Sequence, residues 1–290
     1  MLETIQNTWL TVYGVISEAV ISAFPWINVI LMVMAACLGS LLCGKIKSAV
    51  KDALLRAVGL LTILMGASQL WNNFFVLQTG QFETTGTFLV VISLLVGYAF
   101  GHAFALDRAI GRFGVWLFRR FVKETPKQKI IRVEGTIQIQ PAPEPKPDKL
   151  PSAEGFLLAT VICAFGSPTI RGTLDSQMTQ DALPLLATIG FHVLIFFLLT
   201  ALYSANVALA AFPVLAVEGI LILAGNLCGG LLTHTIVSQF GLIGSVILIA
   251  TGLGLGLGKR FRTAKLLPAY LIPVIYGLVM LLVDQIIEAV

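Results

Sequence analysis

The chain has 290 residues, of which 57% are hydrophobic and 12% charged, and its formal net charge is +4. Soluble domains carry about 25% charged residues, so this composition excludes a water-soluble enzyme and a disordered chain. The four cysteines lie in apolar runs without CxxC spacing, which predicts packing roles and no disulfide framework or metal site. The length is therefore divided into membrane spans of about 20 residues each.

The first 24 residues contain no Lys or Arg, whereas a secretory signal peptide would begin with positive charge. Trp9, Tyr13, Ile16 and Val20 recur at helical spacing. This pattern predicts that segment 1–24 is an amphipathic helix lying in the outer membrane interface, with a ninth span as the alternative.

Apolar runs between charges predict an all-α, polytopic bundle of eight transmembrane helices. The expected spans lie at about 26–43, 54–70, 87–106, 155–170, two within 183–232 divided near 205–213, 242–257 and 266–283. We expect two membrane repeats at 25–107 and 205–290, with spans four and five between them at 153–204.

The 19 basic residues are sharply segregated. All except Arg171 fall between spans one and two, three and four, or seven and eight. Eight spans put these three loops on one side of the membrane, and Lys and Arg near span ends favour the cytoplasm. The N- and C-termini are then both predicted to lie outside.

The long loop, 108–152, divides into three parts. Arg108 to Val122 is predicted to form a basic amphipathic helix, and segment 108–132 to bind anionic lipid of the inner leaflet. Residues 130–140 alternate apolar and polar around Glu134-Gly135, which favours a hairpin, and a Pro-rich linker follows. A solvated, lipid-anchored connector is preferred over a regulatory or partner-binding loop. The loop contains neither of the common nucleotide-binding motifs, and no nucleic-acid partner is expected.

Two pairs of segments indicate an internal repeat. Ala35–Leu42 resembles Gly225–Leu232, and Ala57–Leu70 resembles Leu242–Leu255. Spans one to three would match spans six to eight in opposite orientation, an arrangement typical of secondary transporters. Glycines such as Gly97 and Gly101 predict close helix packing within one chain or between copies, so a homo-oligomer stays an open alternative.

Polar residues inside the hydrocarbon are costly and need a reason. Glu218 is the only acidic residue expected inside a span core, and His192 lies in the middle of span five. Because spans five and six are antiparallel neighbours, the two side chains are expected at similar depth, as a proton site or as a structural hydrogen bond. The remaining substrate or ion candidates are Asn28, Thr188 and Asn226, and gating or interface candidates are His102 and Gln69.

Span four is expected to end in a broken helix over 165–172. Gly166, Ser167 and Pro168 disfavour a continuous helix there, and the exposed backbone, with Ser167, Pro168 and Thr169, is predicted to contact substrate. Arg171 follows and would bind a carboxylate or phosphate at the outer mouth. The alternative is an ion pair between Arg171 and Asp175 or Asp181.

Several motifs occur together in one order: PWIN at 25–28, GSLLCG, the Gly-rich spans two and seven, CAFGSPTIRGTLDSQMTQD at 163–181, and KLLPAY at 265–270. In this order they resemble the YqgA/YdfK-like bacterial membrane protein family, a domain of unknown function. The resemblance implies a multi-span inner-membrane protein and a suspected transporter. Compared with that family, an acid is lost at His192 and one is gained at Glu218, so the family's substrate need not carry over.

The sequence therefore predicts a secondary transporter of a small metabolite or ion, proton- or cation-coupled, in the bacterial cytoplasmic membrane. The rival hypotheses are an ion channel and a non-transporting scaffold or sensor acting through the basic loop. An enzyme is not expected because HExxH and GxSxG are absent and no aspartate lies in a span core. No cofactor is expected.

Overall fold

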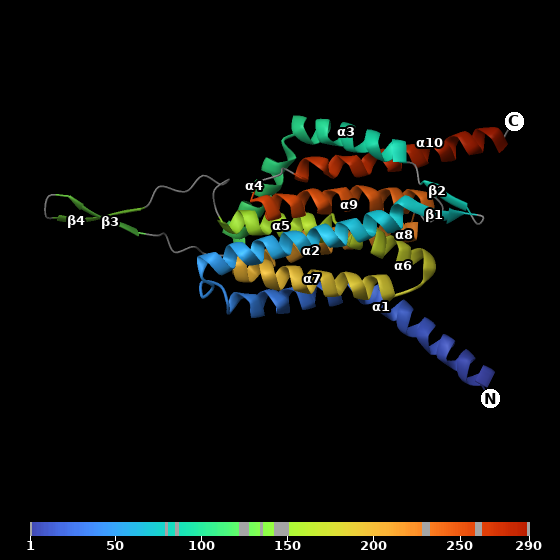
Figure 1. The fold of residues 1–290 in the computed structure, drawn as a ribbon, viewed down its shortest axis with the longest axis horizontal. Coiled ribbons are helices and arrows are strands. Elements are labelled where there is room, and N and C mark those ends of the chain that lie inside the picture. The colour runs from blue at the N-terminus through green and yellow to red at the C-terminus, as the bar shows by residue number, and fades with distance from the viewer. Residues whose placement is uncertain are drawn as a thin grey trace.

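The computed structural model describes residues 2–78, 81–84, 87–121, 128–133, 136–141, 151–227, 233–258 and 263–288. The described chain is dominated by helices (Figure 1). They are α1 Leu2–Ser40, α2 Ser48–Phe74, α3 Thr87–Ala103, α4 Leu106–Phe121, α5 Pro151–Ala164, α6 Ser167–Thr179, α7 Leu183–Leu202, η2 Ala205–Ala210, α8 Ala211–Leu227, α9 His234–Leu257, η3 Thr263–Tyr270 and α10 Leu271–Glu288. Two short antiparallel hairpins join β1 Phe75–Gln78 to β2 Gln81–Thr84 and β3 Gln128–Val133 to β4 Thr136–Pro141.

Seven helical segments among the described residues are long and apolar enough to cross a membrane. They are Tyr13–Ser40, Ser48–Phe74, Glu154–Thr179, Leu183–Leu202, Ala205–Leu227, His234–Leu257 and Thr263–Met280. The bent pair of α3 and α4, with an angle of 62° between its halves, would raise the count to eight. Continuous apolar sequence explains these elements, because a helix satisfies its own backbone hydrogen bonds where no water is present.

The helices run back and forth along one long axis. Figure 1 shows α4 and the β3–β4 hairpin at one end, and both chain ends at the other. The basic segments between α1 and α2, in α4, and at the start of η3 lie at the α4 end. The segregation of basic residues noted in the sequence is therefore a spatial segregation too.

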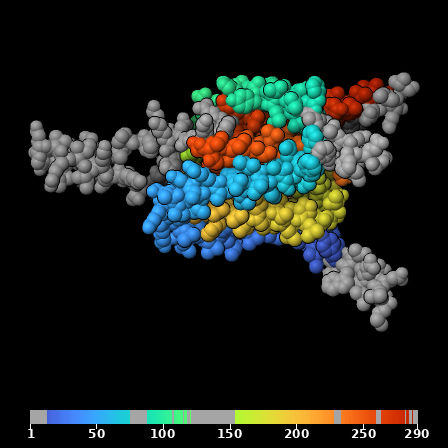
Figure 2. All heavy atoms as spheres, in the orientation of Figure 1, coloured from blue at the N-terminus to red at the C-terminus, as the bar shows by residue number. Residues whose placement is uncertain are grey.

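The outside of the bundle is apolar. Figure 2 shows the face formed by α1, α2, α3 and α9. Phe88 and Leu95 of α3 and Leu64 of α2 are 79%, 68% and 59% exposed. A water-soluble fold would bury side chains of this size, whereas a lipid-facing helix presents them outward. The exposed apolar surface places this chain in a membrane.

Two sequence-based boundaries were wrong. α1 continues through Pro25, so segment 1–24 is not a separate helix: Ser17 donates to the Gln180 carbonyl at 2.7 Å, and Tyr13 to Asp181 at 2.6 Å. One missing N–H is tolerated inside a helix that neighbours support. The fourth span also does not end at residue 170. Its helix is interrupted only at Phe165-Gly166 and resumes as α6 through Thr179.

The loop predictions met mixed outcomes. α4 forms where the basic amphipathic helix was expected, and β3 pairs with β4 in the register Val133↔Thr136, as the alternation predicted. η2 begins where the sequence between spans five and six was divided. Most of the Pro-rich linker lies outside the described residues.

Glycines set the distance between α3 and the last span. A Cβ added at Gly101 would lie 2.0 Å from the carbonyl oxygen of Lys265, and one at Gly97 2.4 Å from the amide nitrogen of Ala269. The backbones of α3 and η3 can therefore approach only because position 101 lacks a side chain.

Gly101→Ala is therefore expected to lower the free energy of unfolding by about 2 kcal/mol or more, because the helices must separate. Thermal unfolding in detergent measures this. Gly190→Ala is the matched control, because a Cβ at Gly190 meets nothing within 4 Å. Equal stability of the two variants would contradict the packing described for α3 and η3.

Candidate functional site

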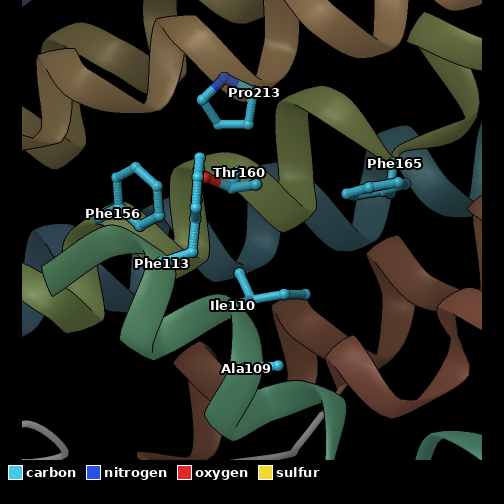
Figure 3. Close-up of a pocket in the computed structure, with 7 residues that line it drawn as sticks. All are labelled: Ala109, Ile110, Phe113, Phe156, Thr160, Phe165 and Pro213. Carbon is cyan, nitrogen blue, oxygen red and sulfur yellow. The ribbon is translucent and has the colours of Figure 1, made fainter. Parts of the chain in front are cut away.

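A cavity of about 210 Å³ lies between α4, α5 and the start of α8 (Figure 3). Its lining is aromatic and aliphatic except for the hydroxyl of Thr160. The lining residues are Ala109, Ile110, Phe113, Phe156, Thr160, Phe165 and Pro213. This surface suits an apolar group and offers little to a polar solute or an ion. The polar chemistry of the molecule lies deeper, beyond Phe165.

Three side-chain hydroxyl groups form hydrogen bonds with backbone carbonyls around the interruption between α5 and α6. Thr169 donates to the carbonyl of Cys163 at 2.5 Å and Tyr270 to that of Phe165 at 2.7 Å. The Thr188 hydroxyl lies 2.9 Å from the carbonyl oxygens of both Pro168 and Pro184. Gly166 is extended, with φ −72° and ψ 153°, and Pro168 lies in the first turn of α6. Carbonyls at a helix end lack intrahelical partners, so buried side chains must satisfy them.

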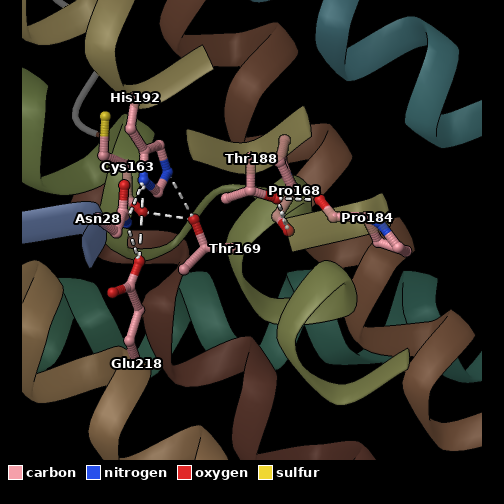
Figure 4. Close-up of polar contacts among 8 residues, drawn as sticks. All are labelled: Asn28, Cys163, Pro168, Thr169, Pro184, Thr188, His192 and Glu218. Atoms are coloured by element: carbon pink, nitrogen blue, oxygen red, sulfur yellow. Dashed lines mark hydrogen bonds and ion pairs between the residues drawn. The ribbon is translucent and has the colours of Figure 1, made fainter. Parts of the chain in front are cut away.

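Beside this break, side chains from four helices meet in one fully buried cluster (Figure 4). His192 of α7 contacts Thr169 through Nε2 at 2.9 Å and the Asn28 amide nitrogen through Nδ1 at 2.8 Å. The same Asn28 nitrogen donates to Oε1 of Glu218. His192 Nδ1 lies 3.8 Å from that carboxyl oxygen. We call Asn28, Thr169, His192 and Glu218 the polar cluster.

The hydrogen bonds of the polar cluster fix its donors. Because the Thr169 hydroxyl proton goes to Cys163, its oxygen must accept from His192 Nε2–H. His192 Nδ1 is then the acceptor for one N–H of Asn28, and the other N–H goes to Glu218. Each N–H and O–H donor of the network then has an acceptor when the imidazole is neutral. The network forms one chain from the broken helix to the Glu218 carboxyl.

Two oxygen atoms of the polar cluster have no hydrogen-bond partner in the structure. They are Oδ1 of Asn28 and Oε2 of Glu218. The hydroxyls of Ser167, Thr173 and Ser176 on α6 are also buried without a partner. Buried polar atoms are normally paired, so a group of unpaired oxygens marks a place for a proton, water, ion or polar ligand. Among the described residues, no three His, Cys, Asp or Glu side chains converge as a metal site.

Apolar side chains close the polar cluster from both directions. Toward the chain termini, Phe24 of α1 packs with Leu185 and Ile189 of α7. Toward the basic end, Met32 of α1 and Phe196 of α7 are fully buried in the main core. The polar cluster is therefore fully buried, with packed apolar side chains on both sides of it along the bundle.

The structure brings Glu218, His192, Asn28 and Thr169 together, as the pairing of Glu218 with His192 suggested. It places Ser167, Pro168 and Thr188 beside them at the break. Asn226 is exposed on α8, two helical turns from Glu218, and His102 is exposed on α3 against the Tyr98 ring. Gln69 is half-buried, and its carbonyl accepts from Asn73.

Arg171 does not face the polar cluster. It lies within α6, and its Nε is 3.6 Å from the Asp175 carboxylate, so the ion-pair alternative describes it. Asp181 instead accepts from the Leu183 N–H and the Tyr13 hydroxyl, and these two donors hold the pKa of Asp181 below its usual range. Arg171 was expected in a loop at the outer side of the membrane. It lies in a helix instead, because only Phe165 and Gly166 separate α5 from α6.

Arg171→Gln is therefore expected to cost about 1 kcal/mol or less in unfolding free energy, since an i,i+4 pair whose side chains are 23% and 27% exposed is partly screened by its surroundings. Thermal unfolding checks this, with Asp175→Asn as the partner variant. If Arg171→Gln unfolds the protein while Asp175→Asn does not, Arg171 has a further role.

Sequence reasoning missed Tyr270, Thr173 and Ser176. Tyr270 ends the KLLPAY motif, so its place in a recurring motif could have singled it out. Thr173 and Ser176 share a helical face with Thr169, a spacing that becomes visible only once α6 is known to continue past residue 170.

Comparison with known proteins gives one family. A family model described as Protein of unknown function (DUF554) matches residues 24–278. The chain is 20% identical over 246 residues to the "Uncharacterized membrane protein YdfK" of Bacillus subtilis (strain 168), which covers 85% of this chain and 91% of that protein. No solved structure matches. The resemblance found in the motifs is thereby confirmed.

Proposed function

We propose that this chain, which belongs to the DUF554 family of proteins, is a secondary transporter of a small polar solute or ion in the bacterial cytoplasmic membrane. Transport is coupled to a proton or cation at the polar cluster. One observation carries the proposal: a carboxyl, an amide and an imidazole are hydrogen-bonded to one another inside membrane-spanning helices, beside a helix break.

A purely structural role explains this arrangement poorly. An ionisable residue inside the bilayer costs about 2.5–3.5 kcal/mol on insertion scales. Well-packed apolar residues would hold the same helices together without that cost. A structural network would also satisfy its members, whereas Asn28 Oδ1 and Glu218 Oε2 lack partners. The unpaired oxygens are free to take up a proton or to contact a bound cation.

The groups around Glu218 set the chemistry of coupling. α1 supplies Asn28, α6 supplies Thr169, α7 supplies His192, and α5 supplies Cys163, which is drawn beside the cluster in Figure 4. A proton added to this set changes which atoms donate, and the Asn28 amide can rotate to offer Oδ1 in place of its N–H. Because Thr169 connects His192 to the Cys163 carbonyl, such a change reaches the helix break directly.

Packing supports the inverted repeat. α2 lies against α9 with Gly59 at Gly252, and α3 lies against η3 with Gly101 at Lys265. α1 contacts α8 through Asn28 and Glu218. Each helix of the first set thus packs against its proposed equivalent, with the two partners running in opposite directions (Figure 1). Two halves related in this way can exchange conformations, as alternating access requires.

We further propose a multi-pass topology of eight spans with both termini outside. The bent pair of α3 and α4 supplies the eighth crossing, and the basic segments then all face the cytoplasm. α4 lies at this end, where its Arg residues would meet anionic lipid. The route for the solute is assigned to the α6 face that carries Thr169, Thr173 and Ser176.

A native cysteine offers the test. Cys163 is fully buried beside the polar cluster, so a protein retaining only this cysteine reports when the cluster opens. The probe is a membrane-impermeant methanethiosulfonate reagent applied to membrane vesicles at about pH 6 and about pH 8, on either side of the usual histidine range. Only the thiolate reacts, so the rate at each pH is divided by the rate of the same cysteine in the denatured protein. We expect this normalised labelling rate to change by about fivefold or more, a typical coupling between states.

A scaffold or sensor working through the basic loop predicts a normalised labelling rate that does not depend on pH. A channel predicts single-channel currents in planar bilayers together with simultaneous access from both sides. The enclosed polar cluster favours a carrier over a channel, because a carrier passes through an occluded state.

A further inference from the structure

The repeat alignment has a consequence at the polar cluster. Ala35–Leu42 aligns with Gly225–Leu232 without a gap, and the same alignment continued toward the N-terminus matches Leu31 with Leu221 and Ile30 with Ile220. Two residues further on, it matches Asn28 with Glu218. The two side chains that bond each other in the polar cluster thus occupy the same position in the two repeats.

The contact between Asn28 and Glu218 is what a two-fold relation between the repeats requires of residues on its axis. When a two-fold axis relates two antiparallel helices, only residues on the axis meet their own equivalents. Asn28 and Glu218 meet directly, and each is fully buried. A chance alignment would rarely match two residues that touch. An error of one residue rotates the matched position by about 100° around its helix and moves it about 1.5 Å along the axis.

We propose that Asn28 and Glu218 form one two-fold site on the pseudo-symmetry axis, in which the ionisable carboxyl can be carried by either repeat. The inference rests on the proposed function and adds where the coupling carboxyl must lie, namely at the position where the two repeats meet. The chain places the acid in the second repeat and its amide partner in the first. α1 and α8 can then tilt about this contact without breaking it.

The exchange has a definite chemical form. In Asn28→Glu/Glu218→Asn, the new amide on α8 donates to the new carboxyl on α1, as the native pair does in reverse. The carboxyl then approaches His192 from position 28, whose native amide nitrogen lies 2.8 Å from Nδ1. His192 on α7 and Cys163 on α5 stay the other titratable neighbours. One titratable carboxyl and one amide are retained in the same volume.

The test uses the Cys163-only protein and the impermeant methanethiosulfonate reagent, with each rate divided by that of the denatured protein at the same pH. Glu218→Asn alone removes the carboxyl, and Asn28→Glu alone places two carboxyls together, so each is expected to lose the pH-dependent change in labelling. The double exchange is expected to recover it to within about threefold of the starting protein, allowing for one altered hydrogen-bond length. Thermal unfolding shows that each variant is folded.

A matched exchange separates symmetry from mere contact. His192→Glu/Glu218→His also swaps two neighbouring members of the cluster, but these are not equivalent in the repeats, so no recovery is expected. If the double exchange at 28 and 218 is folded and lacks the pH response, the two-fold site is wrong while the transporter proposal stands. If the Cys163-only protein itself shows no pH-dependent change in labelling, the proposed transport function is contradicted before the two-fold site is tested. If both double exchanges recover the pH response, closeness of the side chains is sufficient, and the two-fold site is wrong.

Discussion

Replacing Glu218 with glutamine is expected to abolish the pH response of Cys163 labelling while leaving the protein folded. Gln keeps an oxygen that accepts from Asn28, so the free energy of unfolding should change by about 1 kcal/mol or less. It removes the only carboxyl of the polar cluster, so the change in the normalised labelling rate between the two pH values should fall below about twofold. The paired measurements are labelling kinetics and thermal unfolding.

Asp175→Asn is the control for this variant. It also removes one acid from the membrane-spanning region, but Asp175 pairs with Arg171 away from the polar cluster. We expect its labelling response to match that of the starting protein. A Glu218→Gln protein that kept a full response would exclude Glu218 from coupling, and an equal loss in Asp175→Asn would show that the effect is not local.

Thr169→Val is expected to be the most destabilising isosteric change at the site. It removes the hydroxyl that joins the His192 Nε2–H to the Cys163 carbonyl in a buried place. Leaving a buried group unpaired costs about 1–3 kcal/mol, so we expect a loss of about 2 kcal/mol or more in thermal unfolding. The labelling rate of Cys163 should rise as well, because the break is less tightly held.

Thr62→Val provides the comparison within the same fold. The Thr62 hydroxyl bonds back to the Val58 carbonyl in its own helix, and its loss leaves the helix ladder intact. A small change in stability is expected there. If Thr169→Val is no worse than Thr62→Val, the polar cluster and the helix break are not mechanically connected.

Much of the fold could be predicted because membrane helices leave a simple record in the sequence. Apolar runs longer than about 17 residues between charges mark spans, and basic loops mark one side. The errors came where the end of a helix depends on packing against other helices, which hydropathy and charge do not report. Pro25 suggested a boundary, yet α1 continues because packing supports it, and Arg171 suggested a loop although helix resumes at Ser167.

The candidate site was predictable in part for the same reason. Glu218 and His192 stood out because charged and ionisable residues are rare in spans, and adjacent antiparallel spans bring equal depths together. Asn28 was a candidate, but its contact with Glu218 was not predicted, because its place in the repeat suggested a relation to Asn226 instead. The role of Tyr270 could not be predicted, since it depends on η3 reaching the carbonyl of Phe165.

The central claim is that the polar cluster opens to one side of the membrane at a time. The most direct test labels the Cys163-only protein in right-side-out and in inside-out vesicles under the same set of pH conditions. The account predicts reciprocal normalised rates: a condition that speeds labelling from one side slows it from the other, and Glu218→Gln removes this reciprocity. Equal rates from both sides under one condition, or rates that rise and fall together, would contradict it.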